Sequence, residues 1–254
     1  MSSLKDKIKK STTMGGTKEL FIINRLERLF DVEFDREDRI GLHASNILAS
    51  EKDFCYRELV LSFYYKKNKT ELPSNLKRIF LEGTYIHRKW QNLFVKAGIA
   101  ISIEKQHHIE EFDCYMTPDA EIRIGKTEYI VEIKSMNTFA FKHATTHPKG
   151  AKQCKFYMHY KGKTHGIVLM EDKNNQDIKI QLIEYNPDDG DEDIKGYVKR
   201  LENIKKYRKI FEKESKVPKR ICKSSDCKRA IGCPMRDACF NIGMKRIWKE
   251  KDKC

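Results

Sequence analysis

Two acidic residues and a lysine in the segment TPDAEIRIGKTEYIVEIKS, residues 117–135, have the types and spacing that catalysis needs. Glu132 and Lys134 are two apart in a strand-like stretch, so they share one face while the apolar residues before each of them point the other way. If AEIRI pairs with EYIVEIKS, Asp119 lies at the mouth of the same hairpin. Two carboxylates can hold a hard divalent cation, and a lysine can orient a water or stabilise charge building on a phosphate. The alternative is an exposed strand with an ordinary Glu–Lys pair.

Three further polar residues lie on predicted helices. His87 interrupts an apolar helical stripe four residues after Gly83, and a glycine on that face lets a metal site or another backbone come close. A neutral imidazole is a common metal ligand, although a histidine in such a stripe is also found as an ordinary core residue. In QCKFY, Gln153 and Tyr157 are four apart and share a helix face. An amide and a phenol there can touch a phosphate or a base, or simply form the polar edge of an amphipathic helix.

A group of cysteines near the C-terminal end can bind a soft metal. The stretch CKSSDCKRAIGCPMRDAC holds Cys222, Cys227, Cys233 and Cys239, with four, five and five residues between them. Such a density of thiols can close around one ion, and a four-thiolate zinc site is the simplest choice. The alternative is a set of free thiols in a basic tail.

The elements that must position these residues alternate between helix and strand. Helical patterns cover residues 18–60, where Ser45 is expected to cap a helix running on to Tyr65, and then 76–94, where Ser74 or Asn75 is expected as the cap. Strand patterns follow over 101–136, with Gly125 in a hairpin turn, and then a loop to about Pro148. The last expected elements are a helix at 149–162, strands at 165–172 and 177–185, and a charged helix at 191–214. This order predicts an α/β core, a mixed central sheet flanked by helices.

The composition favours a polyanionic partner. The chain has 254 residues, of which 39% are hydrophobic, enough for a packed core. Lysine and arginine outnumber acids 51 to 37, a net charge of +14, so nucleic acid is the first candidate partner. No run of about 18 apolar residues is present to span a bilayer, and the N-terminal MSSLKDKIKKSTTMGG lacks the apolar core of a secretory signal. We therefore expect a cytoplasmic protein without a membrane partner, whose eight cysteines are metal ligands or free thiols rather than disulfides.

Four short motifs together resemble those of one nuclease family. EGTYIH, TPDAEI, VEIKS and QCKFY appear in the order and rough spacing of the RecB-like nucleases of the PD-(D/E)xK superfamily, over roughly residues 45–185. The resemblance implies the restriction-endonuclease-like core of that superfamily, which is a mixed sheet with a helix on each side. One departure is TPD, where the family often has a glycine near the motif aspartate.

The resemblance also implies roles for individual residues. His87, Asp119 and Glu132 would bind a catalytic Mg²⁺ or Mn²⁺, with the main-chain carbonyl of Ile133 as a further ligand. Lys134 would be the catalytic lysine. The two helical residues, Gln153 and Tyr157, would contact DNA near the site. Lys142, which lies in the loop after the E-x-K strand with Phe139 and Phe141, is expected to help guide a DNA strand.

A branch of the same family, including the AddB and CRISPR-associated nucleases, ties an early cysteine to three late ones around a [4Fe–4S] cluster. DFCYRELVLSFYY resembles the early segment, with Cys55 and Arg57 in place. The late pattern is C-x2-C-x5-C, and here Cys233 and Cys239 supply the x5 pair while Ala230 stands where a cysteine is expected. Either Cys227 or Cys222 would complete the set. A [4Fe–4S] cluster and a zinc ion both remain open.

The expected activity is that of a metal-dependent DNA exonuclease acting on ends or single strands in recombination, repair or replication. A helicase or recombination protein is the expected partner, and a phage or mobile element is the expected source. The alternative hypothesis is a DNA-binding accessory protein with an inactive nuclease core. The third hypothesis is a zinc-stabilised adaptor protein. We expect three parts: a flexible basic lead-in at 1–18, a helical part with the nuclease core at 19–215, and a cysteine-rich metal-binding tail at 216–254.

Overall fold

The computed structural model describes residues 22–23, 26, 41–65, 67 and 72–241. These residues fall into two compact units, of which the first includes residues 72–84 and the second includes residues 41–65 and 85–241. Helix α5 (Ser74–Lys96) begins in the first unit and ends in the second. The expected basic lead-in and most of the helical pattern before residue 41 lie outside the described residues.

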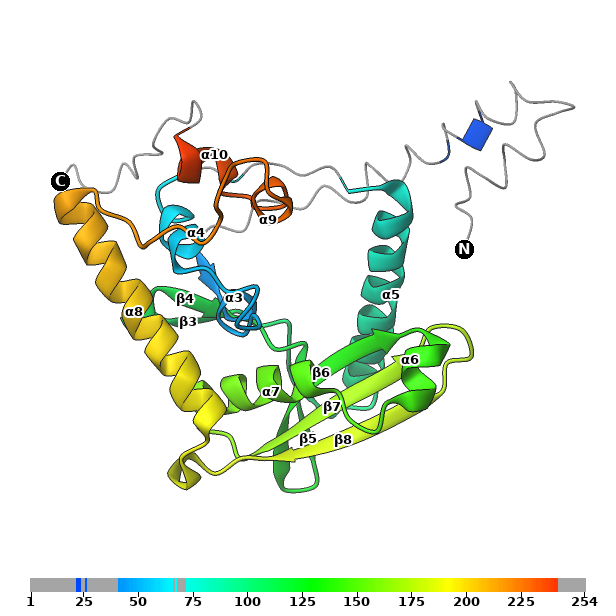
Figure 1. The fold of residues 1–254 in the computed structure, drawn as a ribbon. Coiled ribbons are helices and arrows are strands. Elements are labelled where there is room, and N and C mark those ends of the chain that lie inside the picture. Colours follow the sequence, from blue (N-terminus) through cyan, green and yellow to red (C-terminus); the bar gives the residue numbers. More distant parts are fainter. Residues whose placement is uncertain (1–21, 24–25, 27–40, 66, 68–71, 242–254) are drawn as a thin grey trace, which may run out of the picture. The chain divides into compact units, whose positions relative to one another are not determined.

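A five-stranded mixed sheet forms the centre of the second unit (Figure 1). Its strands are β2 (Ala100–Ile103), β5 (Ala120–Ile124), β6 (Thr127–Met136), β7 (His165–Asp172) and β8 (Ile178–Glu184), in the order β2-β5-β6-β7-β8. The strands β6 and β7 are parallel, and the other neighbours are antiparallel. A parallel pair needs a crossover connection, and this one contains α6 (Thr138–His143) and α7 (Pro148–Lys161).

The two faces of this sheet pack against different helices. Along β6, Ile130 belongs to the core cluster that includes residues of α7, while Val131 and Ile133 belong to the cluster that includes Phe94 of α5. Because successive side chains of a strand point to opposite faces, Glu132 and Lys134 lie on the α7 side. This alternation, predicted from the sequence, is what the structure has.

A smaller sheet and several helices complete the second unit. The smaller sheet has the order β1-β4-β3, with β1 parallel to β4 and β3 antiparallel to it. Its strands are β1 (Leu42–His43), β3 (His107–Ile109) and β4 (Cys114–Met116). The other α-helices are α3 (Ala44–Ile47), α4 (Tyr56–Leu61), α8 (Glu192–Glu214), α9 (Lys228–Ile231) and α10 (Arg236–Phe240), and 3-10 turns cover Glu110–Phe112 and Pro187–Asp189. No helix in the described ranges is both long and apolar enough to cross a membrane.

The prediction of one helix from Ser45 to Tyr65 is wrong. The structure has the short helix α3, which follows His43 as its N-cap, and then α4, which follows Cys55. Between them the Ser50 hydroxyl donates to the Asp53 carboxylate at 2.5 Å, and the backbone N–H of Phe54 donates to the Ser50 carbonyl at 2.8 Å. These local bonds offer the backbone a turn in place of helix.

The segment predicted as a loop before Pro148 contains the helix α6. Its N-cap is Asn137, whose side-chain oxygen accepts from the N–H of Ala140 at 2.8 Å. An asparagine at this position is a good cap, so a start signal was present in the sequence. The other predicted elements are confirmed: α5, α7, α8, β7, β8 and the β5–β6 hairpin, with Gly125 in its turn at φ +61°. The predicted cap of α5 at Ser74 or Asn75 is wrong, because the helix already includes both residues. The predicted mixed α/β class, a central sheet flanked by helices, is also confirmed.

Glycine 166 allows α7 to lie directly on β7, and its replacement provides a test of this packing. A Cβ at Gly166 would lie 2.3 Å from Cys154 Sγ and 2.8 Å from Met158 Sδ, both buried on α7. We expect Gly166→Ala to lower the free energy of unfolding by about 1–3 kcal/mol, the usual cost of overpacking, measured by urea denaturation.

The matched control is Gly196→Ala on α8, where a Cβ would meet nothing within 4 Å. Since alanine is the better helix former, this control should stabilise the protein by up to about 1 kcal/mol. If the two substitutions changed the free energy of unfolding equally, that result would contradict the close approach of α7 to the sheet.

Candidate active site

The β5–β6 hairpin brings Asp119 to Glu132 and Lys134. The register pairs Ala120 with Val131, which places Asp119 at the open end of the hairpin beside the middle of β6. There its Oδ2 atom accepts a hydrogen bond of 2.7 Å from the N–H of Ile133. The predicted convergence of the two carboxylates and the lysine is therefore present.

Glu132 and Lys134 form a buried ion pair on the α7 side of the sheet. The side chain of Glu132 is buried, and Lys134 Nζ donates to its Oε2 atom at 2.6 Å. Burial and the charge of Asp119 raise the pKa of Glu132 to about 7, against the opposing effect of Lys134. Burial alone would lower the pKa of Lys134, but the two carboxylates outweigh it and raise that pKa. The pocket thus disfavours two adjacent negative charges and favours added positive charge.

Helix α5 holds Asp119 from the other side. His87 Nδ1 lies 3.3 Å from Asp119 Oδ1; burial lowers the pKa of His87, but the bond to Asp119 outweighs it and raises that pKa. One helical turn later, the buried Gln91 donates from Nε2 to the main-chain carbonyl of Asp119 at 3.1 Å and to Glu104 Oε1 at 3.0 Å. Sequence reasoning missed Gln91, although its spacing of four from His87 was a signal.

A pocket of about 500 Å³ opens over these groups. Five predicted site residues line it: Asp119, Glu132, Lys134, Gln153 and Tyr157. Its lining also includes residues that sequence reasoning did not single out, among them His43, Glu104 and Gln106. Tyr157 is buried, and burial followed by the charge of Glu132 raises the pKa of its hydroxyl.

Three other predicted residues are absent from the pocket lining: His87, which contacts Asp119 from α5, and the residues Ile133 and Lys142. The side chain of Ile133 is fully buried in the core on the α5 side, so only its backbone faces the site. Lys142 lies exposed on α6, where its main-chain carbonyl is 3.5 Å from Lys179 Nζ. The structure therefore does not bring Lys142 to Lys134, and its predicted contact with DNA stays a prediction.

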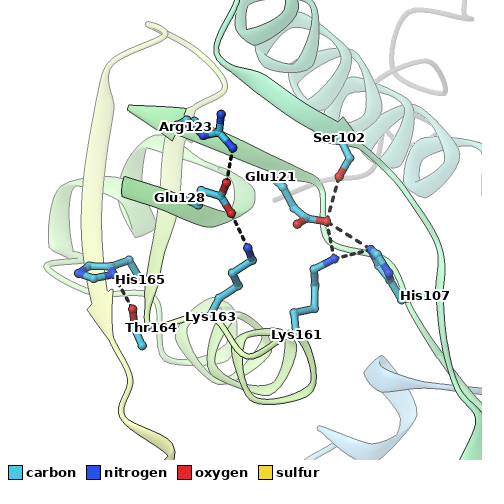
Figure 2. A network of polar contacts seen from close by, with 9 residues as sticks. All are labelled: Ser102, His107, Glu121, Arg123, Glu128, Lys161, Lys163, Thr164 and His165. Carbon is cyan, nitrogen blue, oxygen red and sulfur yellow. Dashed lines mark hydrogen bonds and ion pairs between the residues drawn. The ribbon is translucent and has the colours of Figure 1, made fainter. Parts of the chain in front are cut away.

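A network of charged residues fastens the C-terminal end of α7 to the hairpin (Figure 2). The carboxylate of Glu121 lies 2.7 Å from Lys161 Nζ and accepts from the Ser102 hydroxyl at 2.9 Å. Glu121 is on β5, two residues after Asp119 in the sequence. Burial alone would raise the pKa of Glu121, but bonds from Lys161, Ser102 and His107 lower it. The network keeps α7, and with it Gln153 and Tyr157, over the sheet.

The cysteines gather around a second cavity, of about 200 Å³, between α4 and the C-terminal segment. It is lined by Cys55, Cys222, Cys233 and Cys239. Of these, Cys239 accepts a hydrogen bond from Arg57 Nε at 3.1 Å. Cys227, the remaining predicted ligand, caps α9 and accepts from the N–H of Ala230 at 3.4 Å.

Neither the active-site pocket nor the cysteine-lined cavity contains a complete arrangement of metal ligands. Within the described ranges, no three histidine, cysteine, aspartate or glutamate side chains converge as a ready-made metal site. At the first pocket, the ammonium of Lys134 lies against Glu132, and His87 lies against Asp119. The two other described cysteines, Cys114 and Cys154, are buried in the main core.

Comparison with known proteins finds neither a matching family nor a matching curated protein for the sequence. The structure is similar to an alkaline exonuclease from Laribacter hongkongensis, with a TM-score of 0.49 and 16% identity, over 69% of this chain and 93% of that one. The complex of the same enzyme with dAMP gives the same values. The structure of SSO0001 has a TM-score of 0.44 and 13% identity, over 73% of this chain and 86% of that one. With likeness this distant, the function has to be argued from the site.

Proposed function

We propose that this protein is a metal-dependent deoxyribonuclease of the RecB-like PD-(D/E)xK type, an exonuclease acting on DNA ends or single strands. The observation that carries the proposal is the convergence of Asp119, Glu132 and Lys134 on one pocket, supported from α5 by His87. The acid, lysine and histidine set is complete, which favours an enzyme over a DNA-binding accessory protein with an inactive nuclease core.

The residues of this pocket fit a divalent cation. Carboxylate oxygens are the donors that Mg²⁺ and Mn²⁺ take, and burial together with the charge of Asp119 raises the pKa of Glu132, an effect that a bound cation would oppose. His87, Asp119, Glu132 and the main-chain carbonyl of Ile133 would hold the ion. When bound, it would polarise the phosphodiester and lower the pKa of a water molecule.

The chain's own groups have separate tasks in this proposal. Lys134 orients the attacking water and stabilises the charge that develops on the phosphate. The N–H of Ile133 and the side chain of His87 fix the two carboxylate oxygens of Asp119. Gln153 and Tyr157, which line the same pocket, contact the DNA.

A row of lysines on α8 supports DNA as the partner. Lys199, Lys206, Lys209 and Lys213 are exposed and follow one another at intervals of seven, three and four residues, so they lie on one side of the helix. None of the four forms an ion pair within the described part of the chain, whereas Lys195 pairs with Glu192. A helical row of unpaired lysines suits the phosphates of a DNA strand. A helicase or recombination partner, and a role in recombination or repair, remain part of the proposal.

We further propose that the cysteine-lined cavity holds a metal centre, either a [4Fe–4S] cluster or a zinc ion. The metal would be bound by four of the five cysteines Cys55, Cys222, Cys227, Cys233 and Cys239, and the fifth would not be a ligand. The observation in support is that Cys55 lines one cavity together with three cysteines of the C-terminal segment, which is far from it in the sequence. Thiolate ligation contributes folding energy, so the centre would fasten α4 to the C-terminal segment.

The proposed activity is tested with linear DNA labelled at one end. Single- and double-stranded substrates are incubated with the protein in Mg²⁺, in Mn²⁺ or in a chelator. We expect release of labelled mononucleotides or short fragments with either metal and none in the chelator, with the released label giving the polarity. Tight binding of DNA that stays intact under all three conditions would instead support the accessory protein.

A further inference from the structure

Glu104 is a carboxylate at the candidate active site to which no role has been given. It follows β2 directly and lines the pocket together with Asp119, Glu132 and Lys134. The pairing of β2 with β5 brings its backbone next to Asp119, and its N–H donates to the Asp119 carbonyl at 3.3 Å. Its carboxylate therefore belongs to the wall of the pocket beside the proposed catalytic groups.

The position of Glu104 is held by two unusual features. Its backbone has φ +43°, in the left-handed region that a residue with a side chain seldom adopts. Its Oε1 atom accepts from Nε2 of Gln91, which is only 6% exposed and also holds the Asp119 carbonyl. A strained backbone kept in place by surrounding bonds is a frequent feature of functional sites. Gln91 is thus a positioning residue that fixes Glu104 relative to Asp119.

The partner of Glu104 is a neutral side chain. Glu132 is paired with Lys134, and Asp119 lies against His87, but Glu104 is bonded to a neutral amide. No ion pair of Glu104 occurs among the residues that the structure describes, and its side chain is exposed to the pocket. A charged carboxylate only accepts hydrogen bonds, and it repels a nearby phosphate.

We propose that Glu104 is a specificity-determining residue that restricts cleavage to strand ends. A sugar hydroxyl at the end of a strand donates a hydrogen bond to its carboxylate, whereas a continuing strand would bring its next phosphate against the same negative charge. The phosphates that are bound lie instead toward Lys134, Gln153 and Tyr157. The inference rests on the proposed nuclease function and adds to it the chemical group that the site recognises.

The test compares linear and circular single-stranded DNA of one sequence, with Mn²⁺ present. The wild-type protein is expected to degrade the linear form and to leave the circle nearly intact. Glu104→Gln keeps the shape of the side chain and removes its charge. We expect it to raise the KM for linear DNA and to increase the ratio of circular to linear cleavage at least tenfold, and Glu104→Lys should increase that ratio further.

The matched control is Glu110→Gln, an exposed glutamate that does not line the pocket, which should leave the ratio unchanged. Thermal unfolding of each variant confirms that it is folded. Equal cleavage of circles and linear strands by the wild type, or an unchanged ratio in both Glu104 variants, would overturn the inference while leaving the nuclease function in place. Failure of the wild type to cut either DNA would overturn both.

Discussion

Replacing Lys134 with alanine is expected to reduce DNA cleavage by about 10²- to 10⁴-fold, the range for a positioned acid–base group or charge-stabilising donor. Lys134 forms an ion pair with one of the two carboxylates, with its Nζ atom 2.6 Å from Glu132 Oε2. The loss is expected in kcat rather than in KM, because the ammonium acts on charge that develops during the reaction. Initial rates on end-labelled DNA in Mg²⁺ measure it.

The control for this substitution is Lys126→Ala. The side chain of Lys126 is exposed in the turn of the same hairpin, at the opposite end of the strands from Asp119. The rate of this control variant should equal that of the wild type. Since removing Lys134 leaves Glu132 buried without its counter-charge, some loss of stability is also expected, and DNA affinity measured in parallel shows whether the variant is folded. A folded Lys134→Ala protein with the wild-type rate would exclude the proposed mechanism.

Replacing Cys233 with serine is expected to abolish the proposed metal centre and loosen the C-terminal segment whichever metal is bound, and replacing Cys55 is expected to do so where the centre is a [4Fe–4S] cluster. For structural zinc sites the apparent binding free energy is about 10–16 kcal/mol, as large as the whole free energy of unfolding of a typical domain. Anaerobically purified protein should contain iron and sulfide with a brown colour, or zinc without colour. Cys233→Ser should lose either metal and Cys55→Ser should lose the iron–sulfur cluster, and in a variant that loses its metal the segment after α8 should become sensitive to protease.

The control is Cys114→Ser. Cys114 is fully buried in the main core, away from the cavity, and burial raises the pKa of its thiol to about 12. This substitution is expected to cost stability without changing metal content. A wild-type protein free of both metals, or variants that keep the wild-type content, would show that the cysteines only pack against one another.

The sequence alone determined the features that depend on local periodicity. The alternation of side chains along β6 placed Glu132 and Lys134 on one face, and the turn at Gly125 returned the chain so that Asp119 reached them. The spacing of Gln153 and Tyr157 placed both on one side of α7. These relations hold over few residues, because strand and helix geometry set them before any distant contact forms.

Local sequence patterns predicted secondary structure less reliably where the hydrogen bonds of short polar side chains compete with those of a helix. The turn between Ser50 and Asp53 interrupts a helical pattern, and the cap at Asn137 starts a helix inside an apparent loop. Both depend on side chains bonding to nearby backbone or to each other, and the hydrophobic pattern does not record such bonds. The boundaries of α3, α4 and α6 therefore followed only from the structure.

Only the tertiary structure decided which distant residues join the site. Gln91 reaches Glu104 and Asp119 because β2 pairs with β5 while α5 packs on that face of the sheet. The contact of Lys161 with Glu121 likewise needs α7 to lie across the hairpin. Such contacts depend on the pairing of strands and the docking of helices far apart in the sequence. Since no local period encodes that pairing, the residues that position Asp119 and face its pocket could be identified only in the folded chain.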